Sequence, residues 1–137
     1  MTRPAYRMLP EVTQYSEDFW TGGAKGELRI YRCRSCGHWF HPPTGACFRC
    51  RSRDVGPEVA SGRARVAAFT VNEHQWFPGF PPPYVVAIVE LDEEPDVRLT
   101  TNIVDCELDR VAVGLPVRAV FEERDDLWVP LFAPVEP

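Results

Sequence analysis

The sequence predicts a mainly β protein with a short N-terminal helix, a metal-binding ribbon and a five-stranded C-terminal barrel. Two observations carry this prediction. The stretch 33–50, CRSCGHWFHPPTGACFRC, holds two CxxC pairs separated by ten residues. After residue 61 the chain changes to alternating or β-branched runs separated by turn residues, a pattern typical of successive antiparallel strands. A length of 137 residues accommodates one small barrel and a metal-stapled subdomain.

The N-terminal region is predicted to be an arm followed by a short helix. Residues 1–15 lack periodicity, so we expect an arm that lies on a neighbouring surface or on a partner. Ser16 has the character of a helix N-cap, with two acidic residues directly after it. Phe19 and Trp20 would form the apolar face of the helix, either packed internally or facing a partner. The glycines at 22–23 should end the helix or allow one further turn.

The cysteine pairs predict a metal site. Cys33, Cys36, Cys47 and Cys50 can close a tetrahedron around one zinc ion, and four protein ligands leave no open position, which favours a structural role. Iron bound by the same four sulfurs is an alternative. Disulfides would need an oxidising compartment, whereas the N-terminus has no signal-peptide pattern and a fifth cysteine is left over from the two pairs. We therefore expect a reducing, cytoplasmic setting.

Local patterns around the cysteines suggest how the ribbon is built. The alternating segment 27–33 predicts a strand that leads into the first CxxC turn. Gly37 can supply the positive φ that such a turn needs. Phe48, inside the second CxxC pair, is expected to cover the metal cluster. His38 and His41, between the two pairs, are expected to be surface groups or to support the ligands.

Arginines surround the metal site without any acidic residue between positions 28 and 53. They either neutralise the negatively charged metal–thiolate cluster or form a face for phosphate groups, from nucleic acid or from coenzyme A (CoA). Our candidates for CoA-phosphate binding are Arg34, Arg49, Arg51 and Arg53. Without the six arginines of this stretch the chain has nine basic and twenty acidic residues, which disfavours a nucleic-acid backbone as the main partner.

The C-terminal segments predict a five-stranded barrel. A parity switch within 63–73 predicts a β-bulge near residues 67–68. The β-branched run 84–92 and the alternating segment 97–104 should form a hairpin. A short helical turn is expected between 105 and 114. A second hairpin follows over 116–123 and 127–133, in which Pro130 marks the last strand as an edge or a bulge. This order describes a Greek-key barrel of the OB type, with domains at 1–26, 27–58 and 59–137.

The segment 74–84, HQWFPGFPPPY, is the candidate docking surface. Prolines lower the entropy cost of ordering a loop and aromatic side chains offer large contact areas. Partner contact and folding back onto the barrel both remain possible at this point. The candidate partner-binding residues, including two from the helix, are Phe19, Trp20, His74, Trp76, Phe77, Phe80 and Tyr84. His74 is not part of a constellation that combines a carboxylate with a nucleophile, so we predict no catalytic residue.

Two further partner classes are disfavoured. The outward positions of segment 97–104, Arg98, Thr100 and Asn102, offer no aromatic platform on which nucleic-acid bases could stack. No apolar run approaches the ~20 residues that a membrane span requires, so no membrane association is expected.

With these features in place, the chain resembles the DUF35 family from about residue 13 onward. The resemblance is carried by SEDFW, LRIYRCRSCG, PPTGACFRC, PPYVVAIVELDE, LTTNIVDCELDRVAVGLPVRAVFEE and WVPLFAP. Ala46 and Arg49 depart from the family pattern around the second CxxC pair, where members often carry Arg and Pro. This departure alters the loop but not the ligands.

The resemblance implies a rubredoxin-like zinc ribbon joined to an OB-fold, in an accessory protein of acyl-CoA metabolism. Family members pair with thiolase-fold enzymes, including archaeal acetoacetyl-CoA thiolase with hydroxymethylglutaryl-CoA synthase, and lipid-transfer-protein-like aldolases. In actinobacterial steroid degradation, a similar domain is fused to or associated with a MaoC-like hydratase and activates a retro-aldol cleavage of a side-chain CoA ester. We expect this role. The alternatives are a stand-alone acyl-CoA carrier, a single-stranded nucleic-acid module and an iron-bearing electron carrier.

Overall fold

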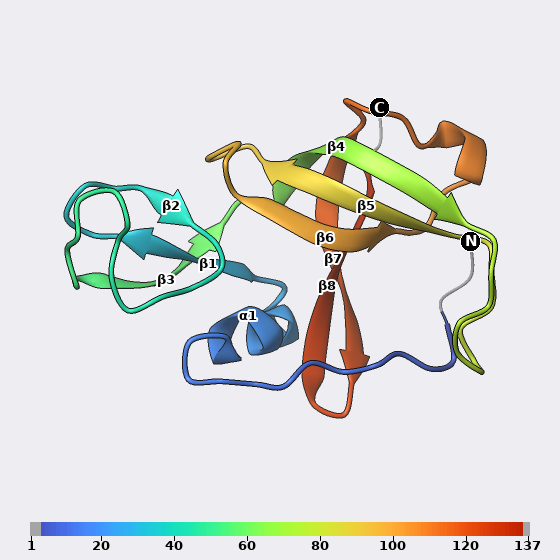
Figure 1. The fold of residues 1–137 in the computed structure, drawn as a ribbon, viewed down its shortest axis with the longest axis horizontal. Coiled ribbons are helices and arrows are strands. Elements are labelled where there is room, and N and C mark those ends of the chain that lie inside the picture. The colour runs from blue at the N-terminus through green and yellow to red at the C-terminus, as the bar shows by residue number, and fades with distance from the viewer. Residues whose placement is uncertain (1–3, 136–137) are drawn as a thin grey trace.

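The computed structural model describes residues 4–135, which form a three-stranded ribbon sheet beside a closed five-stranded barrel. Figure 1 shows the two β units side by side along the long axis of the molecule, with helix α1 close to their junction. The fold class predicted from the sequence is confirmed. Within these residues no helix is long and apolar enough to cross a membrane.

Helix α1 (Glu17–Thr21) is short and continues as a 3₁₀ turn, Gly22–Lys25. Ser16 occupies the predicted N-cap position, but its hydroxyl does not cap the helix. Instead, its Oγ accepts a hydrogen bond of 2.9 Å from the backbone N–H of Thr13. The Ser16 side chain therefore stabilises the end of the arm and not the helix. The 3₁₀ turn confirms the further turn toward Lys25 that the sequence allowed.

Gly23 allows the 3₁₀ turn to approach the barrel closely. A Cβ atom at this position would lie 2.5 Å from Trp128 Cβ and 2.6 Å from a ring carbon of Phe121. Such distances are shorter than any normal carbon–carbon contact. Position 23 therefore needs a residue without a side chain because of this close contact, and not only to end the helix.

We expect Gly23→Ala to destabilise the protein by about 1 to 3 kcal/mol, the range for overpacking in a well-packed contact. Chemical denaturation followed by fluorescence would measure the change in the free energy of unfolding. Ala24→Val adds volume at the exposed neighbouring position and should change stability by less than about 0.5 kcal/mol. Equal stabilities of Gly23→Ala and the native protein would contradict the close contact.

The ribbon sheet comprises β1 (Leu28–Cys33), β2 (Trp39–Phe40) and β3 (Val55–Ala60), in the antiparallel order β2-β1-β3. The alternation that predicted β1 is visible in its burial. Leu28 and Ile30 are 2% and 1% exposed and belong to the same apolar core as the barrel. The opposite end of β1 carries Cys33. The strand therefore connects the metal-binding turns to the core of the whole molecule.

The barrel consists of β4 (Arg63–Asn72), β5 (Tyr84–Leu91), β6 (Arg98–Ile103), β7 (Pro116–Arg124) and β8 (Leu127–Pro134), closed in the order β4-β5-β6-β8-β7. Both predicted hairpins and the predicted bulge are confirmed, the bulge as a register shift between Val66 and Ala68. The expected helical turn is a 3₁₀ helix, Leu108–Arg110. Strand β8 pairs with β6 at Ile103↔Phe132 and with β7 along its length, where Pro130 lies opposite Phe121. The Pro130 carbonyl accepts a hydrogen bond of 3.1 Å from Thr101 Oγ1 of β6, so Pro130 does not lie at an open edge of the closed barrel.

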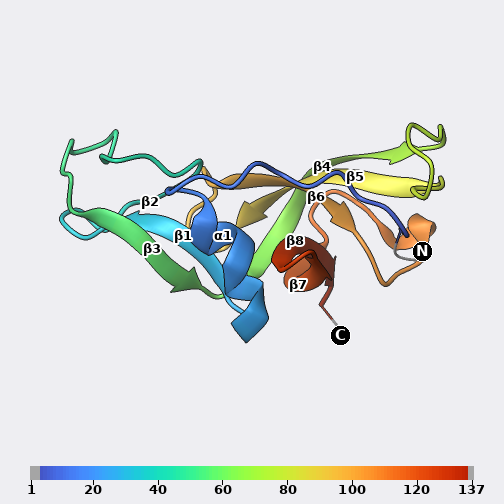
Figure 2. The same ribbon diagram turned by 90° about the horizontal axis from the view of Figure 1, so that it is seen from below.

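The N-terminal arm lies on the chain's own barrel. Figures 1 and 2 show it running from α1 past the β7–β8 hairpin toward the loop between β4 and β5. A hydrogen bond of 2.8 Å from Arg124 to the Ala5 carbonyl ties it to the end of β7. Of the two sequence-based possibilities, a neighbouring surface is therefore the one the structure shows for residues 4–10.

Candidate metal centre and docking surface

The first CxxC turn follows directly from β1. Cys33 is the last residue of the strand, and the N–H of Gly37 donates to the Cys33 carbonyl at 2.9 Å. The backbone N–H of Cys36 points at Cys33 Sγ, at 3.4 Å. Gly37 has φ = +80°, the left-handed conformation that the sequence led us to expect.

The second CxxC turn repeats this geometry with a different residue. The Arg51 N–H donates to the Cys47 carbonyl at 2.8 Å, and the Cys47 N–H donates to the Ser52 carbonyl at 2.8 Å. Arg51 occupies the position that corresponds to Gly37 and has φ = +66°. A left-handed arginine is unusual, since its Cβ crowds the backbone in this conformation.

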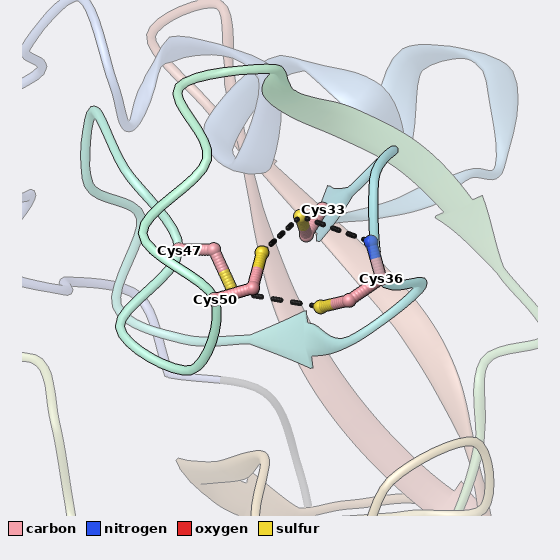
Figure 3. Close-up of side chains that lie close together, drawn as sticks. All are labelled: Cys33, Cys36, Cys47 and Cys50. Atoms are coloured by element: carbon pink, nitrogen blue, oxygen red, sulfur yellow. Dashed lines mark hydrogen bonds between the residues drawn. The ribbon is translucent and has the colours of Figure 1, made fainter.

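The two turns bring the four predicted ligands together. Figure 3 shows their side chains pointing toward one another, two from the turn after β1 and two from the segment between β2 and β3. The four Sγ atoms lie within 4.8 Å of one another. Cys33 Sγ is 3.5 Å from Cys50 Sγ, and Cys36 Sγ is 3.8 Å from Cys47 Sγ. Sulfurs around a tetrahedral zinc with bonds of about 2.3 Å lie about 3.8 Å apart, so the residues fit this ion.

The electrostatics of the cluster also favour a cation. The backbone N–H of Cys36 lowers the pKa of Cys33 to about 6. At Cys50 the Ser52 N–H acts in the same direction, but hydrogen bonds with the Cys33, Cys36 and Cys47 thiols and burial outweigh it and raise the pKa to about 12. Successive deprotonation of four adjacent thiols therefore becomes unfavourable, and a bound metal ion removes this obstacle.

The immediate surroundings of the cluster differ from expectation. Phe48 is 73% exposed, so most of its ring faces solvent instead of covering the sulfurs, and its ring contacts His38 edge-on with centroids 5.0 Å apart. The buried ring next to the cluster is Phe40. His38 is also buried, with no hydrogen-bond partner for either ring nitrogen among residues 4–135, and its Nδ1 lies 3.8 Å from Glu94 Oε2. His41 is half-buried against Phe19, and burial lowers its pKa.

The arginines around the cluster divide into two groups. Arg29, Arg32 and Arg34 form ion pairs with carboxylates that lie outside the arginine-rich stretch. Arg34, for example, lies 3.6 Å from Asp54. The other three, Arg49, Arg51 and Arg53, are exposed and form no ion pair within residues 4–135. The second CxxC turn therefore presents a positively charged surface that neighbouring carboxylates do not neutralise.

The aromatic loop lies between β4 and β5, and its tip is exposed. Trp76 is 65% exposed and Phe77 is 40% exposed. The Trp76 ring contacts His74 with centroids 4.4 Å apart, and its Nε1 donates to Asn72 Oδ1 at 3.0 Å. These contacts orient the indole ring without burying it. The loop thus displays three of the candidate residues to solvent.

The remaining candidates lie in two other places. Phe80 and Tyr84 pack against each other, with centroids 4.5 Å apart, and are half-buried at the base of the loop. Phe19 and Trp20 are half-buried between α1 and the barrel. Both helix residues line a groove along β6. The groove consists of two adjoining pockets with volumes of about 210 and 450 Å³. The seven residues therefore do not form one continuous patch.

The structure adds one exposed residue to the loop surface and a second elsewhere on the arm, and it removes one from the outer face of the barrel. Tyr6, 45% exposed, contacts Phe77 with ring centroids 6.2 Å apart, and Met8 in the same arm is 62% exposed. No sequence signal pointed to either residue. Asn102, expected to face outward, is buried because Arg7 of the arm covers it and donates to its Oδ1 at 2.9 Å.

Comparison with known proteins finds two family models that match successive parts of the chain. Residues 20–56 match the model of the ChsH2 rubredoxin-like zinc ribbon domain. Residues 58–122 match the model of the ChsH2 C-terminal OB-fold domain. A "DUF35 domain-containing scaffold protein" of Methanocaldococcus jannaschii is 37% identical over 69% of this chain and 70% of its own length. The chain belongs to the DUF35 family.

Two other relatives extend well beyond the matched region. The chain is 40% identical to a "probable enoyl-CoA hydratase alpha subunit" of Thermomonospora curvata, covering 97% of this chain. It is 36% identical to the "3-oxo-4,17-pregnadiene-20-carboxyl-CoA hydratase alpha subunit" of Mycobacterium tuberculosis, covering 90% of this chain. The chain spans 41% and 39% of the lengths of these two relatives.

A solved DUF35 structure matches both units of the fold. The matched chain belongs to a structure described as the "Ltp2-ChsH2(DUF35) aldolase", with a TM-score of 0.82 and 34% identity. The match covers 92% of this chain and 98% of that chain. The correspondence therefore includes the ribbon and the barrel together.

Proposed function

We propose that this chain is a non-catalytic accessory subunit that binds and activates a thiolase-fold acyl-CoA enzyme. The observation that carries the proposal is the likeness, at a TM-score of 0.82, to the DUF35 chain of the Ltp2-ChsH2 aldolase. The scaffold name of the M. jannaschii relative supports the same role. The chemistry of the metal site supports a non-catalytic role, because four thiolate ligands occupy all four positions of a tetrahedral zinc ion and leave none for substrate.

The metal in this proposal is a structural zinc held by Cys33, Cys36, Cys47 and Cys50. Its chemical contribution is to cross-link the two CxxC turns. The protein's own residues then do the positioning, since β1 links the cysteine turn to the barrel core through Leu28 and Ile30. The ribbon and the barrel would consequently present a fixed surface to the partner.

The finer proposal concerns the reaction. We infer that the partner is a lipid-transfer-protein-like aldolase that performs retro-aldol cleavage of a steroid side-chain CoA ester. The pregnadiene-carboxyl-CoA name of the M. tuberculosis relative supports a steroid substrate. The two hydratase names support a MaoC-like hydratase as a second associated protein, which would supply the hydroxylated ester that a retro-aldol cleavage requires.

We assign partner contact to the exposed aromatic loop. Trp76 and Phe77 provide large apolar areas on a proline-rich segment, which is the composition typical of energetically dominant contacts at interfaces. His74, Phe80 and Tyr84 would shape and support the loop. Phe19 and Trp20 would contribute at the groove along β6.

We assign the phosphates of the partner's CoA ester to Arg34, Arg49, Arg51 and Arg53. The last three are exposed and free of ion pairs within residues 4–135, so they can neutralise phosphate charge. We expect Arg49→Ala with Arg51→Ala to raise the KM of the complex for its CoA ester about tenfold with kcat unchanged, since each loss of about 1.4 kcal/mol is tenfold.

Initial-rate kinetics of the assembled complex would measure this effect. Arg118→Ala, at an exposed position on β7, is the matched control and should leave KM unchanged. An unchanged KM in the double variant would exclude these arginines from CoA binding.

Association is tested by co-expressing the chain with the thiolase-fold protein encoded nearest to it, followed by size-exclusion chromatography. We expect the two proteins to elute together as one heteromeric species. Separate elution would contradict an accessory subunit and favour the stand-alone carrier, which calorimetry of CoA esters with the isolated chain would then detect.

A further inference from the structure

The N-terminal arm is fastened to the barrel by a charged network next to the aromatic loop. We propose that Arg7 is a positioning residue: it holds the arm in place, and the arm in turn sets the conformation of the loop 73–83 for docking. The docking part of this inference rests on the proposed function. The positioning part concerns the chain alone.

Arg7 is anchored at two sites of the barrel. Its Nη1 donates to Asn102 Oδ1 on β6 at 2.9 Å, and its Nη2 lies 3.4 Å from Glu122 Oε2 on β7. The side chains of Arg7 and Glu122 are only 12% and 8% exposed. Charges so removed from water persist only when they are paired, and the planar guanidinium can meet both acceptors at once. The arm therefore has one defined position on the barrel at this residue.

Arg124 fastens the preceding residues of the arm. Its Nε donates to Glu122 Oε1 at 2.7 Å. The Glu122 carboxylate therefore binds both Arg7 of the arm and Arg124 of the barrel. The remaining Arg124 nitrogens donate to the carbonyls of Ala5, at 2.8 Å, and Pro4. The network therefore holds both the side chain and the backbone of the arm.

The fastened arm contacts the loop at three successive places. The Tyr6 N–H donates to the Gly79 carbonyl at 2.9 Å, and the Tyr6 ring contacts that of Phe77. The guanidinium carbon of Arg7 lies 5.1 Å from the centroid of the Phe80 ring. Gly79 has φ = +81°, and a Cβ there would lie 2.8 Å from Tyr6 Cβ. This close approach shows that loop and arm fit together through a residue without a side chain.

Apolar packing contributes little beside Arg7 in this part of the arm. A hollow of about 580 Å³ lies between residues 5–9 and the end of the β7–β8 hairpin. The nearest apolar anchor is Leu9, which packs with Val104 and Leu131. Between Pro4 and Leu9 the arm is therefore held mainly by hydrogen bonds and charge, with the Tyr6–Phe77 ring contact as an apolar addition, so the loss of one guanidinium should loosen it.

The test is hydrogen exchange of the isolated full chain carrying Arg7→Met, which keeps the length of the side chain and removes its charge. We expect the backbone amides of residues 73–83 to exchange about tenfold faster or more, while the exchange rates of β5 stay unchanged. The two segments can respond differently because each opens locally with its own free energy. Arg7→Lys, which retains the charge but not the fork of donors, should restore part of the protection. Arg118→Met on exposed β7 is the control and should leave the loop unchanged.

Gly79→Ala provides an independent route, because it separates loop from arm while leaving the Arg7 network intact. Faster loop exchange in both variants, with weaker binding to the thiolase-fold partner, is the expected result. Unchanged loop exchange in Arg7→Met would overturn the inference, as would faster exchange with undiminished partner binding. Absence of any complex with the native chain would instead count against the proposed function, while the exchange result would still decide whether Arg7 orders the loop.

Discussion

Cys47→Ser is expected to abolish metal binding and unfold the ribbon. The variant removes one of the four thiolates that lie within 4.8 Å of one another. Structural zinc supplies folding free energy directly, about 10 to 16 kcal/mol in zinc-finger peptides, and the ribbon sheet has little apolar core of its own. Metal content measured by mass spectrometry should fall from about one to below about 0.1 zinc per chain.

The loss should extend into the barrel. Leu28 and Ile30 of β1 are buried in the common core, and each fully buried aliphatic side chain contributes about 1.5 to 3 kcal/mol. Thermal unfolding of the variant should therefore begin at a lower temperature even when monitored by barrel residues.

Cys106→Ser is the matched control, since this cysteine lies outside the cluster and should leave metal content and ribbon stability unchanged. A full complement of zinc in Cys47→Ser would contradict the four-thiolate assignment. Iron rather than zinc in the native protein would revive the electron-carrier alternative, and a visible absorption spectrum would reveal it.

The second large effect is expected at the loop. Trp76→Ala with Phe77→Ala should weaken binding to the thiolase-fold subunit about 30-fold or more, because the loss of even one aromatic hot-spot residue typically costs about 2 kcal/mol of binding free energy. Both side chains are exposed, so the stability of the isolated chain should change little. Isothermal titration calorimetry against the partner would measure the affinity.

Phe48→Ala provides a comparison of similar size, because Phe48 is 73% exposed but lies on the ribbon away from the loop. If Phe48→Ala weakens binding and the loop variant does not, then the partner docks on the ribbon. The loop assignment would then be wrong.

The parts of this molecule that could be predicted from sequence are those encoded by neighbouring residues. The CxxC spacing predicts the four ligands because each pair closes its own turn, as the Cys36 N–H to Cys33 Sγ contact illustrates. Strand parity predicts the bulge at Val66 and Ala68 because the side-chain period of a strand is two.

The parts that could not be predicted depend on distant residues. Arg7 and Glu122 are 115 positions apart, so no local pattern marks the arm as part of the barrel surface. Asn102 illustrates the consequence: its parity placed it correctly on the outer face, but the arm covers that face.

The most direct test of an accessory role is to titrate the purified thiolase-fold enzyme with this chain while measuring cleavage of the steroid-type CoA ester. We expect negligible cleavage by either protein alone. Activity should rise with added chain and saturate when the partner is fully bound, and the Trp76 and Phe77 double variant should require a higher concentration to reach saturation. Undiminished cleavage by the enzyme without this chain would contradict the account.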